Sequence, residues 1–292
     1  MPLAPFGFAL HGGAGFDPQH DYTPQIEQLR TVTAQARTQL QEGAAAIDVA
    51  SQAIIAMERC GLYIAGRGAS ANAEGDYELD ACLMDGARGT AGAVAALQGF
   101  KSPIQVARAL MDHSPHVLLV SQGAARFARE KGLEPIDEPS SWFTPALTGE
   151  SFACADAGGH GTVGCVVLDQ HGHLAAATST GGLLHKYPGR VGDTPLVGAS
   201  TWADTQVAVS CTGHGEAFIR RAAAVQVAHR LRFGHGTLEE AVAAVLADVQ
   251  SANGAGGLIA MTRQGEIRAS YNAYGMKHAY LLPDGSIHAA AR

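Results

Sequence analysis

Residues 161–180 read GTVGCVVLDQHGHLAAATST, and this stretch decides the fold. Two β-prone runs, 163–169 and 174–179, flank the turn-forming residues 170–173. Such a pattern predicts an antiparallel hairpin. Glycines and prolines interrupt the chain just before it, so the first strand begins abruptly after Thr162. This sharp junction makes Thr162 the first candidate for a functional residue.

Helical and strand patterns alternate through the rest of the chain. Apolar residues at helical spacing predict helices at 24–41, 44–59, from 103 onward, 122–131, 216–233 and 237–248. Short apolar or alternating runs predict strands at 7–10, 78–84, 92–98, 117–120, 207–211, 258–261, 267–270 and 278–282. Thr23 is the expected N-cap of the first helix, and Thr237 begins a capping box. The order of elements indicates an α+β architecture in which helices cover sheets.

Residues 132–161 break every period with proline and glycine. We interpret this segment as a linker of about 30 residues, a length that is unusual inside a compact domain unless the segment is functional or processed. We expect the parts on either side of its end, 1–161 and 162–292, to fold together as one domain.

The composition excludes several classes of protein. Of 292 residues, 47% are apolar and 16% are charged, and the net charge is −7. The apolar content excludes global disorder, and an acidic balance without basic clusters argues against a nucleic-acid partner. The sequence has no apolar run of about 18 residues and no signal-peptide pattern, so we expect no membrane span and a cytoplasmic protein. Five widely spaced cysteines agree with a reducing compartment, and the low charge favours self-association.

Thr162 gains chemistry if the peptide bond before it is cut. A free α-amino group has a pKa of about 7.7–8.0, so it can act as a general base for the hydroxyl of the same residue. The alternative is structural, because threonine also favours the start of a β-strand.

Three further segments carry groups that suit such a nucleophile. A hydroxyl of the run 178–180 can lie beside Thr162 at the end of the hairpin. Arg190 and Asp193 can bind the carboxylate and the ammonium of an amino acid, although an Arg-x-x-Asp string is also a common surface ion pair. At the turn from strand to helix, residues 212–215 offer a hydroxyl and backbone N–H groups for an oxyanion hole.

These segments closely resemble the plant-type asparaginases, also called isoaspartyl peptidases. The resemblance rests on HGGAG at 11–15, ELDACLMDG at 78–86, GTVGCVVLDQHGHLAAATSTGG at 161–182, YPGRVGDTPLVGA at 187–199 and SCTGHGE at 210–216, and it spans nearly the whole chain in the family's order. It implies an αββα sandwich of the N-terminal-nucleophile hydrolase type, made as a precursor that cleaves itself. The implied substrates are L-asparagine and β-aspartyl dipeptides, and the implied assembly is an (αβ)₂ pair of cleaved chains.

The resemblance also assigns roles to residues. It implies that Thr162 is the nucleophile, freed by cleavage after Gly161, and that Thr180 hydrogen-bonds it. Arg190 would hold the substrate α-carboxylate. The α-amino group would be held by Asp193 with the backbone around Gly213 and Gly215. Thr212 and the Gly213 N–H would form the oxyanion hole.

The sequence departs from the family pattern at three places. Ile64 replaces the usual asparagine in a loop that binds sodium through backbone carbonyls in family members. The carbonyls of Glu58, Cys60, Tyr63, Ala65 and Arg67 are therefore only candidate sodium ligands. The linker is shorter than usual, and 272–276 differs on the leaving-group side of the pocket. We expect no required cofactor beyond this structural sodium, and no metal at the histidine pairs 113/116 and 171/173.

Two other functions remain open from the sequence. A glycosylasparaginase shares the fold and the amino-acid clamp but needs a pocket that admits a sugar. An unprocessed binding protein would keep the clamp without cleavage.

Overall fold

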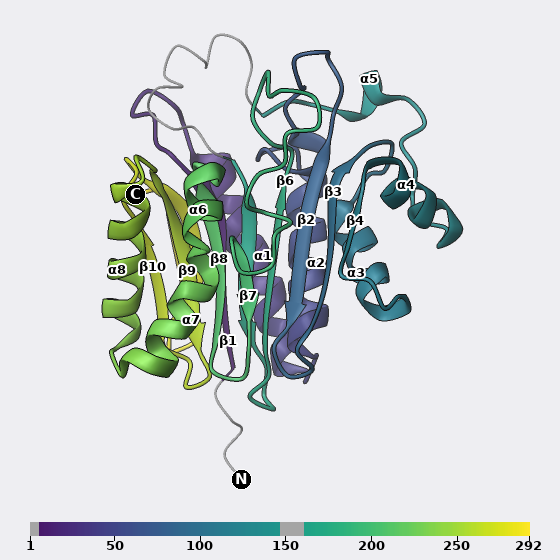
Figure 1. Ribbon diagram of the computed structural model, residues 1–292. Helices are drawn as coiled ribbons and strands as arrows, with labels where there is room; N and C mark the ends of the chain where they lie inside the picture. Colours follow the sequence, from purple (N-terminus) through teal and green to yellow (C-terminus); the bar gives the residue numbers. More distant parts are fainter. Residues whose placement is uncertain (1–5, 147–160) are drawn as a thin grey trace.

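The computed structural model describes residues 6–146 and 161–292 (Figure 1). They form two β-sheets that pack face to face, with helices covering both outer faces. The eight-stranded sheet has the order β12-β11-β1-β5-β6-β2-β3-β4, and the four-stranded sheet has the order β10-β9-β8-β7. The protein is thus an αββα sandwich, as the resemblance predicted.

Strand and helix bounds follow the sequence patterns closely. The large sheet contains β1 Gly7–Ala14, β2 Leu79–Asp85, β3 Thr90–Leu97, β4 Leu118–Val120, β5 Val163–Leu168, β6 Leu174–Thr180, β11 Met276–Leu281 and β12 Ile287–Ala290. The small sheet contains β7 Thr201–Ala203, β8 Val207–Gly213, β9 Gly256–Thr262 and β10 Ile267–Tyr271. The helices are α1 Thr23–Gln41, α2 Ala46–Arg59, α3 Pro103–His113, α4 Ser121–Glu130, α5 Pro139–Trp142, α6 Gly215–Arg221, α7 Ala223–Gly234 and α8 Leu238–Ser251, and η1 Gly66–Gly68 is a 3₁₀ turn.

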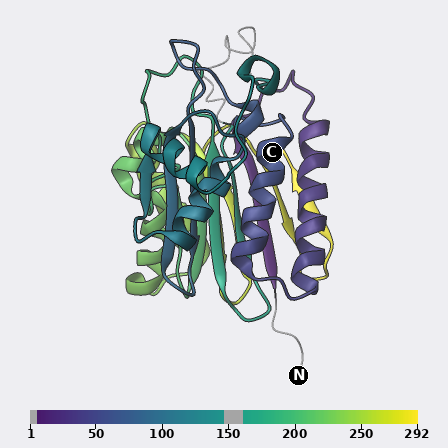
Figure 2. The same cartoon turned by 90° about the vertical axis from the view of Figure 1, so that its right-hand side faces the viewer.

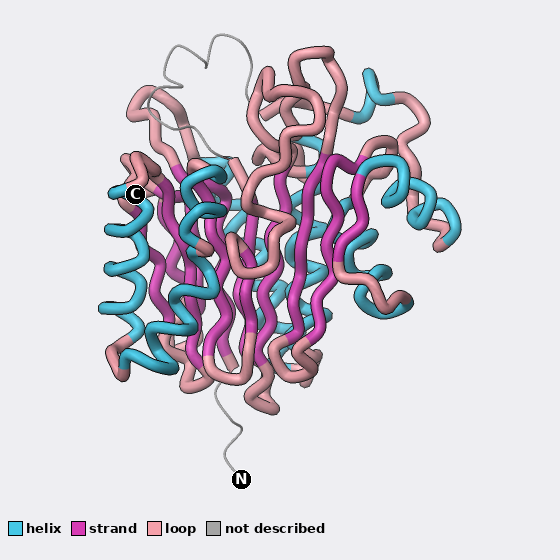
Figure 3. Tube along the Cα trace, viewed as in Figure 1, coloured by secondary structure: helices cyan, strands magenta, loops and turns pink. Residues whose placement is uncertain are grey.

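Helices pack against the outer face of each sheet, and the inner faces of the two sheets pack against each other. Alternate residues of β1 show this, since Phe8 and Leu10 point into the core under α1 and α2, whereas Ala9 lies in the core between the sheets. Figure 2 views α1 and α2 on the outer face of the large sheet, and Figure 3 shows the strands enclosed between helical layers. A third core lies between the small sheet and the helices α7 and α8.

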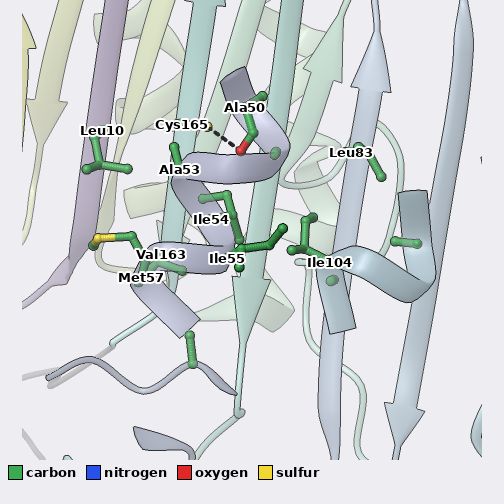
Figure 4. Packing of buried hydrophobic residues seen from close by; sticks show 14 of the residues in the cluster. Leu10, Ala50, Ala53, Ile54, Ile55, Met57, Leu83, Ile104, Val163 and Cys165 are labelled. Carbon is green, nitrogen blue, oxygen red and sulfur yellow. Dashed lines mark hydrogen bonds between the residues drawn. The ribbon is translucent and has the colours of Figure 1, made fainter. Parts of the chain in front are cut away.

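The central hairpin is anchored from the helical side. Val163 and Cys165 of β5 pack against α2, as Figure 4 shows for the side chains around Ile54 and Met57. The Cys165 thiol also donates a hydrogen bond to the Ala50 carbonyl, with 3.6 Å between sulfur and oxygen. This packing fixes the start of β5, where Thr162 lies.

Several boundaries differ from the sequence predictions. Thr23 is the first residue of α1 and not its N-cap, because Asp21 accepts the Thr23 N–H. The predicted helix 216–233 is two helices, since Ala222 has a left-handed backbone with φ of 46°. The carbonyls of Gly198 and Ala199 accept hydrogen bonds from the start of α7, which turns it away from α6.

The first half of the predicted linker, residues 132–146, contains some regular structure. Pro135 forms an isolated β-bridge with Phe100, and the short helix α5 follows. The remainder of that prediction, 147–160, lies outside the described residues. Strands β7 and β12 were missed, because each is only three or four residues long.

Candidate active site

Thr162 and Thr180 lie side by side at one end of the central hairpin. Strand β5 starts directly after Thr162, β6 ends at Thr180, and Val163 pairs with Ser179 in the antiparallel register. The Thr162 hydroxyl donates to the Thr180 hydroxyl, with 3.1 Å between the oxygens. Both residues are buried. The contact agrees with the role that the sequence predicted for Thr180.

Thr180 is itself held in one orientation. Its hydroxyl oxygen accepts the Gly182 N–H at 3.1 Å and donates to the Ile64 carbonyl at 3.4 Å. With its own proton committed to Ile64, the Thr180 oxygen is free to accept the Thr162 proton. The arrangement holds the Thr162 hydroxyl in one orientation.

Behind this pair lies a buried carboxylate that sequence reasoning missed. Glu58 accepts hydrogen bonds from the Ser179 hydroxyl at 2.7 Å and the Ile104 N–H at 3.1 Å, and also from the Ser102 hydroxyl. Burial raises the pKa of Glu58 to about 7, although the three donors act in the opposite direction. Because Ser179 precedes Thr180, Glu58 ties this end of β6 to α2 and α3. The sequence pointed to Glu58 only as a backbone ligand.

A small pocket opens over Thr162 and joins the predicted site residues. It is lined by Gly161, Thr162, Thr180, Gly182, Leu183, Arg190, Gly192, Asp193, Thr194 and Gly213. Thr162, the predicted nucleophile, therefore shares one cavity with Gly161 and with the two charged side chains of the predicted clamp. Gly161 and Arg190 come from segments far apart in the sequence, so the fold alone brings them together.

The charged pair is arranged differently from a simple Arg–Asp bridge. Arg190 binds Glu216, with its Nε and Nη2 atoms each 2.9 Å from a carboxylate oxygen. Asp193 is buried, and its Oδ2 atom has no hydrogen-bond partner among the described residues. Burial raises the pKa of Asp193 to about 6. A buried carboxylate oxygen at a pocket wall suits an ammonium ligand.

Glu78 fixes the loop that carries this clamp. The Lys186 ammonium donates to the Glu78 carbonyl at 2.9 Å and lies 3.6 Å from its carboxylate. The Gly189 N–H donates to the same carboxylate at 2.8 Å. The predicted strand beginning at Glu78 thus ends up supporting Arg190, one residue after Gly189.

The predicted oxyanion donors are consecutive residues at the end of β8, and of the two only Gly213 is among the residues that line the pocket. Thr212 is completely buried, and its hydroxyl oxygen accepts the Ala14 N–H at 3.2 Å, which leaves its proton to donate. Gly215 lies against the clamp, since a Cβ there would be 2.9 Å from Asp193 Oδ1 and 3.0 Å from Arg190 Nη2.

A chain of hydroxyl groups between the sheets was not predicted. His11 Nε2 lies 3.0 Å from Ser210 Oγ, and Thr178 Oγ1 is 2.7 Å from both Ser210 Oγ and Thr201 Oγ1. Burial lowers the pKa of His11 to about 3, so the ring is neutral. Gly164 makes room for this chain, because a Cβ there would lie 2.0 Å from Ser210 Oγ. The signal in the sequence was polar residues at inward positions of β1, β6 and β8.

The candidate sodium loop curls tightly on itself. A Cβ on Gly66 would lie 2.6 Å from the Glu58 carbonyl oxygen, and one on Gly68 would lie 2.1 Å from that of Tyr63. The carbonyls of Tyr63, Ala65 and Arg67 accept backbone N–H groups, and each keeps a second lone pair. Backbone carbonyl oxygens are the kind of donor that a hard cation prefers, so the sodium ligands stay a prediction at this loop.

Within 6–146 and 161–292, histidine, cysteine and carboxylate side chains form no group of three or more that could hold a metal ion. No helix in those ranges is long and apolar enough to cross a membrane.

Comparison with known proteins agrees with this geometry. The family model described as Asparaginase matches residues 4–150 and 144–290. The chain is 40% identical to an isoaspartyl peptidase of Salmonella typhimurium, covering 93% of this chain and 94% of that one. It is 39% identical to the isoaspartyl peptidase of Escherichia coli, with coverages of 93% and 91%. It is also 35% identical to the isoaspartyl peptidase/L-asparaginase of Homo sapiens, with coverages of 96% and 94%. The chain therefore belongs to the asparaginase family.

Proposed function

We propose that this protein is a self-processing threonine hydrolase that releases L-aspartate from L-asparagine and from β-aspartyl dipeptides. The observation that carries the proposal is the pocket in which Thr162 lies with Arg190 and Asp193. A free L-aspartyl head group has one carboxylate and one ammonium, which match these two side chains. The names of the relatives support the same substrates.

The first reaction is cleavage of the chain itself. Thr162 Oγ attacks the Gly161 carbonyl carbon, the C–N bond breaks, and the hydroxyl proton ends on the departing nitrogen. Water then hydrolyses the resulting ester, which yields the Gly161 carboxylate and restores the Thr162 hydroxyl. The products are an α-chain of 1–161 and a β-chain of 162–292, the latter having 292 − 161 = 131 residues.

The second reaction uses the amine that cleavage creates. The neutral α-amino group of Thr162 takes the proton from its hydroxyl, which attacks the side-chain carbonyl of the substrate. The C–N bond breaks, and ammonia or an amino acid leaves with that proton. Water hydrolyses the β-aspartyl ester and releases aspartate. Gly213 N–H and the Thr212 hydroxyl stabilise the negative oxygen in both steps.

We further propose a cytoplasmic (αβ)₂ assembly. Cys60, Cys82, Cys165 and Cys211 are free thiols, which supports a reducing compartment. Two 30.1 kDa units give a particle of about 60 kDa, and light scattering measures this directly. The reaction requires no cofactor in this proposal, and a sodium ion in the loop 58–67 would act structurally.

A maturation assay followed by kinetics tests the proposal. The wild-type chain should give two bands on a denaturing gel, whereas Thr162→Ala should remain a single chain of 292 residues. The mature protein should release aspartate from L-asparagine or a β-aspartyl dipeptide. An unprocessed chain that binds aspartate would instead identify a binding protein, and cleavage of Thr162→Ala would disprove the nucleophile assignment.

A further inference from the structure

Among the described residues, Ile64 is a buried side chain that belongs to none of the three hydrophobic cores. It is 3% exposed and lies in the loop between α2 and η1. Its carbonyl accepts the Gly181 N–H at 2.7 Å and the Thr180 hydroxyl at 3.4 Å. The backbone of Ile64 is therefore fixed to the strand end that orders the nucleophile.

The side chain of Ile64 covers Gly161, the residue before the bond that is cut. A Cβ on residue 161 would lie 2.3 Å from Ile64 Cγ1, 2.6 Å from Ile64 Cβ and 2.7 Å from Ile64 Cδ1. Carbon atoms in favourable contact are about 3.5–4.0 Å apart. A side chain at position 161 thus requires either Ile64 or the scissile peptide to move.

Ile64 has little freedom to yield. Its side chain is β-branched, so few χ1 rotamers are open to it. One of the three close contacts involves its Cβ, which no rotamer change displaces. With the Ile64 backbone hydrogen-bonded to both Thr180 and Gly181, the scissile peptide is the part that moves.

We infer that Ile64 is the specificity-determining residue of self-cleavage, because its side chain admits only glycine before Thr162. This inference rests on the proposed self-processing. A residue at 161 that clashes with Ile64 shifts the carbonyl carbon away from Thr162 Oγ. Misplacement of reacting atoms by about 1 Å can lower a rate by about 10²-fold, so we expect such a precursor to fold but to cleave slowly.

A double-mutant cycle on cleavage tests the inference. The time course of conversion from one chain to two is followed by intact-mass spectrometry after synthesis in vitro, with no substrate present. Gly161→Ala should slow cleavage by about 10²-fold in the otherwise native chain. In the Ile64→Gly background the same change should slow cleavage by less than about threefold, because the side chain that clashes with the new Cβ is gone. Ile64→Ala, which keeps the Cβ contact, should rescue only in part.

Controls separate the possible failures. Gly123→Ala in α4 adds a Cβ that meets nothing within 4 Å, so it should cleave at the wild-type rate. Unfolding temperatures of the uncleaved chains show whether a slow variant is still folded. Equal slowing by Gly161→Ala in both backgrounds, or no slowing at all, would overturn the inference. A wild-type chain that never cleaves would contradict the proposed processing and this inference together. If self-cleavage depends on Gly161 and Ile64 as expected but the mature protein does not hydrolyse β-aspartyl substrates, only the proposed substrate reaction is contradicted.

Discussion

The Arg190 guanidinium is held by Glu216 through two hydrogen bonds of 2.9 Å, one from Nε and one from Nη2. The Arg190 side chain is 17% exposed, whereas that of Glu216 is 61% exposed. Glu216 thus occupies one edge of the guanidinium from the solvent side. The other nitrogen, Nη1, lies toward Gly192 in the pocket wall. The pairing orients Arg190 and still leaves a donor for a substrate carboxylate.

Arg190→Ala should therefore lower kcat/KM for L-asparagine by an amount equivalent to about 2–5 kcal/mol, as expected when a buried charge loses its partner. Glu216→Gln is the matched variant, because it keeps the size of the side chain and one of the two acceptor oxygens and removes the charge. Since the Arg190–Glu216 pair is partly exposed, this change should lower kcat/KM by an amount equivalent to less than about 1 kcal/mol, mostly through a higher KM. Steady-state kinetics on both variants measure the difference. Near-normal kcat/KM in Arg190→Ala would remove the clamp from the proposal.

The Thr180 hydroxyl should matter for both reactions of Thr162. Thr180→Val keeps the shape but cannot accept the hydrogen bond of the Thr162 hydroxyl, so we expect self-cleavage and kcat each to fall by about 10²-fold, the cost of a misplaced reacting group. Thr180→Ser restores the hydroxyl and should recover most of the activity. A Thr180→Val protein with normal cleavage and normal kcat would show that the 3.1 Å contact is structural.

Thr212→Val should lower kcat with little change in KM. Loss of one oxyanion donor typically costs about 10²–10³ in kcat, because the negative oxygen exists only in the transition state. The change also leaves the Ala14 N–H without its acceptor, so Thr212→Ser is the needed control and should retain kcat. The kinetics decide between two roles: a large rise in KM with unchanged kcat would assign Thr212 to ground-state binding.

Binding of L-aspartate should depend on the ionisation of Asp193. Burial raises the pKa of Asp193 to about 6, and only the ionised carboxylate attracts the ligand's ammonium. As the pH falls through 6 the carboxylate becomes protonated and binding is lost, so the inhibition constant should rise about tenfold per pH unit below 6. The Asp193→Asn protein should bind weakly at every pH. If it keeps the same slope, another group is responsible for the titration.

The residue patterns were sufficient to predict an α+β architecture because the strands are locally marked, and the family resemblance supplied the αββα order of the layers. The run from Val163 to Thr180 has β-branched and small apolar residues around a turn, and the structure has the same hairpin. The capping box at Thr237 is also confirmed, since Thr237 and Glu240 exchange the expected hydrogen bonds. The division of the predicted helix 216–233 at Ala222 had no such local signal. Alanine favours helices, and the bend depends on carbonyls of 198–199 that are distant in the sequence.

The same distinction between local and long-range features applies to the site. Thr162, Arg190 and Asp193 could be predicted, because their residue types and the family motifs indicate their chemistry. The partners of these residues could not. Glu216 on Arg190 and Glu58 on Ser179 are contacts that arise only when α6 and α2 pack around the hairpin. A lone glutamate in a helical pattern carries no sign of such a partner.

The strand order gives the proposed cleavage a lasting consequence for folding. In the large sheet, β1 and β2 belong to the part before Thr162, whereas β5 and β6, which lie between them, belong to the part after it. Once the chain is cut, two separate polypeptides contribute neighbouring strands to one sheet, and they can dissociate only if the central strand pairs break. We expect denatured precursor to refold as one molecule at any dilution. Denatured mature protein has to reunite two partners, so its recovery depends on concentration, and its lifetime is set by how slowly it unfolds.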